Sequence, residues 1–143
     1  MKRLIALALA TALSLALLSA CGGDDDADTQ QEGRTRAIAT LTENTVDAWV
    51  ANGPEAIHNV LHVRIMDECS DSAYLAIMED EPRPTAWRNT KDITLSEDLQ
   101  SATATVVVVI DGQDVEQQWA FEVEAGFRWR VTDAPGVAEC VGA

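Results

Sequence analysis

The sequence predicts an α+β fold in which helices come first and an antiparallel sheet of about four strands follows. Apolar residues recur every three to four positions from Arg34 to Met78, which is typical of amphipathic helices. From Lys91 onward, apolar and polar residues alternate with a period of two, as in strands with one buried face. A layer of helices followed by a run of strands is the element order of α+β domains.

The helical half predicts three helices. The first covers Arg34–Ala51, and Asn52-Gly53-Pro54 ends it, because glycine follows helix ends and proline fits a first helical position. The second covers Glu55–Glu68. A third, short helix follows Ser70, whose hydroxyl suits an N-cap. Two prolines one residue apart, in Glu81-Pro82-Arg83-Pro84, cannot continue it.

The strand half predicts a meander. A short strand covers Asp92–Leu95, and Ser96-Glu97-Asp98 forms a turn. The next strand, Ala102–Ile110, contains four consecutive valines and should be buried on both faces or nearly so. Asp111-Gly112 is a strong hairpin signal. In the last two strands, buried and solvent-exposed positions alternate. Opposite charges on the exposed faces could pair across the strands: Glu122 and Glu124 against Arg128 and Arg130.

This element order, closed by Gly126-Phe127-Arg128-Trp129-Arg130-Val131, resembles small NTF2-like (cystatin-like cone) domains. The resemblance covers residues 34–143. It implies a curved sheet around the first helix and a conical cavity that serves as an active site, holds a ligand or is filled by side chains. Enzymatic members place acids or histidines inside the cone. Here the inward positions are Val, Trp, Phe, Ala and Ile, so we expect a protein that is not an enzyme.

Residues 1–20 have the layout of a secretory signal peptide. A positive start, Met1-Lys2-Arg3, precedes the apolar run Leu4–Leu18 of 15 residues. That run is shorter than the roughly 20 residues that span a bilayer. Its end, Leu18-Ser19-Ala20-Cys21, resembles the bacterial lipobox. The resemblance implies cleavage between Ala20 and Cys21, acylation of Cys21 with diacylglycerol and a fatty acid such as palmitate, and anchoring on the extracytoplasmic side of the bacterial cell membrane. The alternative is a plain secretory signal with an incidental cysteine.

Residues 21–33 are predicted to be a disordered acidic tether. Glycines and repelling carboxylates dominate them, and no large apolar residue is present to be buried. After cleavage the chain would carry 8 basic and 24 acidic residues, a net charge of −16. Such a surface repels phosphate backbones, so a nucleic acid is not an expected partner.

Cys69 and Cys140 are predicted to form a disulfide. They are the two cysteines left when Cys21 is lipidated, and exported proteins mature in an oxidising compartment. The alternative is a catalytic cysteine, which would need a histidine and an activating environment.

Large aromatic side chains gather where a core or pocket should lie. They are candidates for either role, at Trp49, Tyr74, Trp87, Trp119, Phe121 and Trp129. Asn44, Tyr74 and Gln117 could supply polar groups to a cavity.

His58 and His62 stand four apart on the second predicted helix, a spacing at which two imidazoles can share a metal, and Glu55 could add a carboxylate. The simpler interpretation is a pair of surface histidines. No cofactor motif is present, and we expect neither a metal nor a cofactor.

Three functions follow as hypotheses. The first is a lipid-anchored domain that binds a small apolar ligand or a protein partner. The second is an isomerase- or hydrolase-like enzyme with an acid inside the cone, and the third is an accessory interaction protein of envelope assembly. The sequence does not determine the oligomeric state.

Overall fold

Helices precede the strands along the chain, as predicted, and one short helix that was not predicted follows the last strand. The structure is a computed structural model that describes the backbone of residues 23–143 and the side chains of residues 26–143. The predicted signal peptide, its cleavage site and Cys21 lie outside these residues. The helices and strands are α1 (Gly23–Asn52), α2 (Glu55–His58), α3 (Val63–Glu68), α4 (Asp71–Met78), β1 (Ala86–Leu95), β2 (Ser101–Ile110), β3 (Gln113–Glu124), β4 (Arg128–Asp133) and α5 (Val137–Val141). This arrangement confirms the α+β class.

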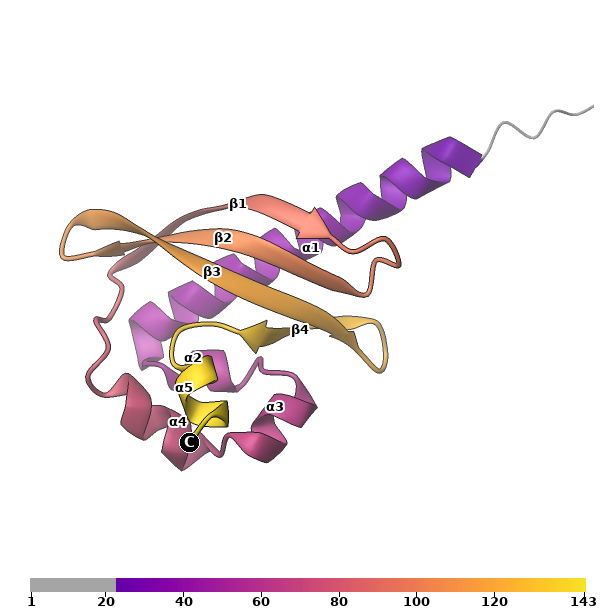
Figure 1. The fold of residues 1–143 in the computed structure, drawn as a ribbon. Coiled ribbons are helices and arrows are strands. Elements are labelled where there is room, and N and C mark those ends of the chain that lie inside the picture. Colours follow the sequence, from indigo (N-terminus) through magenta and orange to yellow (C-terminus); the bar gives the residue numbers. More distant parts are fainter. Residues whose placement is uncertain (1–22) are drawn as a thin grey trace, which may run out of the picture.

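The four strands form one antiparallel sheet in the order β1-β2-β3-β4. Figure 1 shows α1 running along one face of the sheet, with the shorter helices gathered beyond the β4 edge. Asp111 and Gly112 both have positive φ, 52° and 78°, as the two central residues of a type I′ hairpin turn require. The hairpin between β2 and β3 is therefore where the sequence predicts it.

The α1 helix begins at Gly23 and not at Arg34, so here the structure differs from the prediction of a disordered tether over residues 21–33. Asp26 and Asp28 lie near its N-terminus, where the helix dipole favours negative charge. Glu32 and Arg36 form an i,i+4 ion pair with 2.8 Å between Oε1 and Nη2. These local interactions support helix where no apolar residue is buried.

The second predicted helix is interrupted after His58. Residues 60–62 leave the helix to pair with the edge of the sheet. The N–H of Val131 donates to the Val60 carbonyl at 2.9 Å, and the N–H of His62 donates to the Val131 carbonyl at 2.8 Å. A single parallel bridge, Leu61 to Val131, results. Backbone groups used in this way cannot also bond within a helix, so the predicted helix becomes α2 and α3.

The β1 strand begins at Ala86, six residues before the strand predicted from Asp92. Its register with β2 shifts between Trp87 and Asn89 and again between Lys91 and Thr94. Each shift breaks the alternation of inward and outward side chains. The period-two pattern is therefore absent from the sequence of this strand although the strand is present.

The two faces of the sheet differ in polarity. Trp119 and Phe121 of β3 point into the core and are 1% exposed. Ion pairs lie on the opposite side, including Arg88 with Asp114. Of the predicted cross-strand pairs, Arg130 bonds Glu124 at 3.1 Å, whereas Glu122 pairs with Arg64 of α3. Residues 104–109 of β2 are all buried, which confirms the prediction for the valine run.

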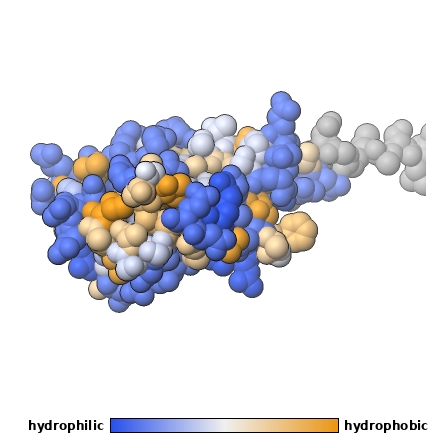
Figure 2. All heavy atoms as spheres, turned by 60° about the horizontal axis from the view of Figure 1, so that its bottom comes forward, coloured by the Kyte–Doolittle hydropathy of each residue, from blue (hydrophilic) through white to orange (hydrophobic). Residues whose placement is uncertain are grey.

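The predicted disulfide between Cys69 and Cys140 is present, with 5.4 Å between the Cα atoms. It joins the end of α3 to α5, and its long loop predicts a stabilisation of about 4 kcal/mol. Figure 2 views the molecule from the side of the short helices, where apolar atoms gather within a mostly polar surface. None of the helices in the described part of the chain has both the length and the apolar character needed to cross a bilayer.

Candidate functional site

A groove of about 450 Å³ lies between α1 and the α2 segment. Its lining comes from one side of α1 and from residues 55–60: Leu41, Asn44, Thr45, Ala48, Asn52, Glu55, Ala56, Asn59 and Val60. The α1 residues recur at helical spacing, so they share one side of that helix. The neighbouring side of α1, with Ile38, Val46 and Trp49, is buried in the core. The groove volume is within the range of small-molecule sites.

The groove has an apolar floor and a polar rim. Leu41, Ala48, Ala56 and Val60 supply the apolar surface. The rim carries three carboxamides and one carboxylate, all on exposed residues: Asn44, Asn52, Asn59 and Glu55. Each carboxamide offers both a donor and an acceptor, whereas the Glu55 carboxylate only accepts. Within residues 26–143, no hydrogen bond engages these four side chains, so all of them are available to a bound molecule.

The α1 helix ends where the groove does, and the predicted stop signal is confirmed. Gly53 has a φ of 109°, and its N–H donates to the Trp49 carbonyl at 2.9 Å. Arg83, from the proline-rich link, donates through Nη2 to the carbonyl of Val50 at 2.7 Å and to that of Trp49 at 3.2 Å. These bonds satisfy carbonyls that a helix end leaves without partners. They also fix Asn52 and Glu55 on either side of a short turn.

The aromatic residues named as core or pocket lie in the core. Trp49, Tyr74, Trp119 and Phe121 are at most 2% exposed, and the half-buried Trp87 and Trp129 pack against the hydrophobic core that these four help to form. None of the six lines the groove between α1 and α2. The sequence therefore predicted an aromatic cluster that is present, and its members fill the core between the helices and the sheet instead of lining a pocket.

Polar atoms of the core aromatics are already bonded. The Tyr74 hydroxyl donates to the Pro135 carbonyl at 2.8 Å, and burial, followed by the Glu81 carboxylate, raises the pKa of Tyr74. Trp119 donates through Nε1 to Gln117 at 3.2 Å. Of the three polar residues considered for a cavity, only Asn44 faces the groove.

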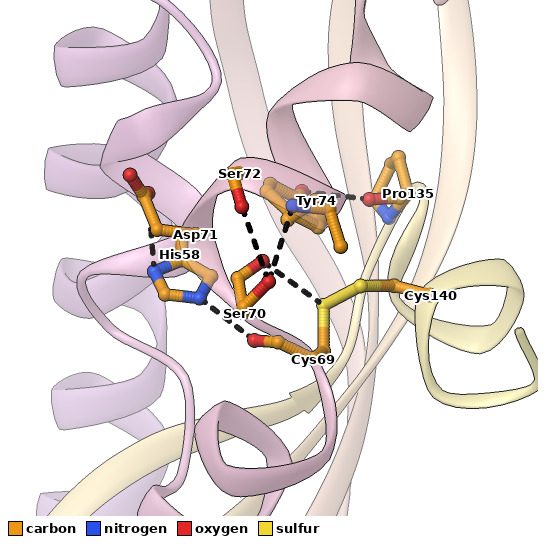
Figure 3. Close-up of a disulfide and its surroundings, with 9 residues drawn as sticks. His58, Cys69, Ser70, Asp71, Ser72, Tyr74, Pro135 and Cys140 are labelled. Carbon is orange, nitrogen blue, oxygen red and sulfur yellow. Dashed lines mark hydrogen bonds and ion pairs between the residues drawn. A yellow bond between two sulfur atoms is a disulfide. The ribbon is translucent and has the colours of Figure 1, made fainter.

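His58 and His62 do not share a site, because the helix that would align them is interrupted. The buried His58 has Nε2 3.0 Å from the Cys69 carbonyl oxygen and Nδ1 3.5 Å from Asp71 Oδ1, beside the disulfide (Figure 3). His62 is the N-cap of α3, and its Nδ1 accepts from the N–H of Arg64 at 3.3 Å. Both rings thus serve local structure. In the described part of the chain, no three His, Cys, Asp or Glu residues are placed to hold a metal.

The hypothesis of an enzyme requires a carboxyl group buried in the cone. Among residues 26–143, no Asp or Glu is buried. Desolvation raises the pKa of Asp133, but this residue lies on the surface at the end of β4. The structure therefore provides no residue for the role of an internal acid within these residues.

The sequence did not single out the groove, although one signal for it was present. Asn44, Ala48 and Asn52 are spaced by four and form a row of polar and small residues beside the core-facing row of α1. The other wall comes from residues 55–60, and the sequence did not predict that they pack beside this row of α1. No protein-family model, curated protein or solved structure matched this chain, so the function is argued from the groove itself.

Proposed function

We propose that this chain is an exported, lipid-anchored protein whose α+β domain binds a small, largely apolar ligand in the groove between α1 and α2. The observation that carries the proposal is the groove itself, with its apolar floor and the unengaged polar side chains on its rim. Ligand sites commonly combine an apolar surface with a few polar groups that fix orientation.

Export and anchoring are supported by the sequence of residues 1–21 and by the Cys69–Cys140 disulfide, because stable disulfides are typical of oxidising compartments. The NTF2-like cone is proposed on the element order, since helices followed by a four-stranded meander are what that resemblance implies. In this proposal the cone is filled by aromatic side chains, and the ligand lies on the outer side of α1.

The proposal is tested by ligand retention. The purified protein is incubated with a lipid extract of cells and purified again, and the retained molecules are identified by mass spectrometry. Ala56→Trp, which places a large side chain in the groove, should abolish retention. Ala76→Trp, the same change at an exposed position of α4, should not. If nothing is retained, or if both variants retain the same molecules, the groove is not the binding site.

A second function, docking to an envelope protein, is favoured by the tip of the β3–β4 hairpin. Phe127 is 84% exposed and has a φ of 61°. The left-handed region costs a residue other than glycine roughly 1 kcal/mol or more, and such strain is concentrated at functional positions. A photo-crosslinking amino acid at position 127 should capture one recurrent neighbour in intact cells, and the same group at the exposed Val115 should not. Random capture at both positions would argue against docking.

A further inference from the structure

We infer that the groove between α1 and α2 prefers amphipathic cations, with an alkylammonium ion as the simplest member of the class. The inference rests on the proposed function, since it specifies the kind of ligand. It assigns the alkyl part to the apolar floor and the charged head to the end of the groove formed by Asn52, Glu55 and Asn59.

The polar rim carries negative charge and no positive charge. Glu55 is the charged member of the groove lining, and no Lys, Arg or His belongs to that lining. A primary ammonium has three donors and no acceptor. The Glu55 carboxylate and the amide oxygens of the neighbouring asparagines are complementary to such a head. An anionic head would instead meet a carboxylate with no lining cation to offset the repulsion.

The surroundings strengthen this preference. The chain has a net charge of −14, so its field attracts cations. Arg83, the basic residue at this end of α1, is engaged with the carbonyls of Trp49 and Val50. Its Nη2 therefore satisfies the helix end, and Arg83 is not part of the groove lining.

Three probes with the same alkyl chain test the inference. Octylammonium, 1-octanol and octanoate are titrated into the purified, isotope-labelled protein at pH 7, below their aggregation concentrations. The amide shifts of residues 41–60 report binding at the groove. An exposed ion pair is weak, so we expect octylammonium to bind about three- to fivefold more tightly than octanol, and octanoate to bind most weakly.

Two matched variants locate the preference. Glu55→Gln keeps the size of the side chain and removes its charge, so octylammonium should then bind about as weakly as octanol. Glu97→Gln makes the same change in the β1–β2 turn and should leave all three affinities unchanged. Tight binding of octanoate, or an unchanged preference for octylammonium in Glu55→Gln, would overturn the inference while the proposed function stands. If octanol and the other two probes all fail to shift these residues, the proposed function fails as well.

Discussion

Removal of the Cys69–Cys140 disulfide is expected to cost about 4 kcal/mol of unfolding free energy. The two cysteines are 71 positions apart. For a loop of that length, the chain-entropy relation gives about 4.4 kcal/mol at 25 °C. Small domains are stabilised by roughly 5–15 kcal/mol in total, so this loss is a large share of the whole.

The double variant Cys69→Ala/Cys140→Ala is the appropriate perturbation. Both side chains are buried, at 1% and 4% exposure, and alanine avoids placing unpaired hydroxyl groups in the core. With a urea m-value of about 2 kcal/mol/M, the midpoint should fall by about 2 M. The m-value should also rise, because the uncrosslinked unfolded chain exposes more surface.

Urea unfolding followed by tryptophan fluorescence measures both quantities, and wild-type protein in excess reductant is the control. The reduced wild type should match the double variant to within about 1 kcal/mol. A loss below about 1 kcal/mol with an unchanged m-value would refute the reasoning, since it would mean that the crosslink does not restrict the unfolded chain.

Three further outcomes follow from single side chains. Tyr74 is the chain's one tyrosine, and burial raises its pKa above the ordinary 10.0. Because the folded state holds the phenol proton more tightly than the unfolded state, the free energy of unfolding should keep its full value below pH 10 and fall as the pH rises further. A tyrosinate absorbance midpoint at or below pH 10 would contradict this. Phe127→Gly should stabilise the protein to urea by about 1 kcal/mol, because glycine adopts positive φ freely, and a destabilised variant would show that Phe127 makes contacts of its own. Ser70→Ala should lower the free energy of unfolding in urea by about 1 kcal/mol, because Ser70 Oγ accepts from the N–H of Ala73 at the start of α4. Ser70→Thr, which keeps a hydroxyl for the cap, is the matched control, and an equal loss in both variants would contradict the capping role.

Features encoded by neighbouring residues could be predicted from the sequence. The Asp111-Gly112 turn, the Ser70 cap and the end of α1 at Gly53 each depend on local backbone preferences. The valine run of β2 and the Cys69–Cys140 pair were also predictable, because four consecutive valines and an even pair of cysteines after residue 21 are plain sequence signals.

Features decided by distant contacts could not be predicted. Residues 60–62 look helical by period, but their backbone bonds to Val131, far along the chain. The first residues of β1 do not show the period-two pattern by which strands are predicted, because a bulge reverses which side chains face inward. The groove could not be predicted either, because it depends on how the side of α1 that carries Asn44 and Asn52 packs beside residues 55–60.

The pairing of Leu61 with Val131 also hinders edge-to-edge association between copies of this chain. A sheet has two outer strands, and each offers unpaired backbone groups to a strand of another chain. Residues 60–62 occupy part of the β4 edge. The β1 edge is made irregular by its two register shifts and by Asp92, whose φ is 52°. Both outer strands are therefore poor templates for edge-to-edge aggregation.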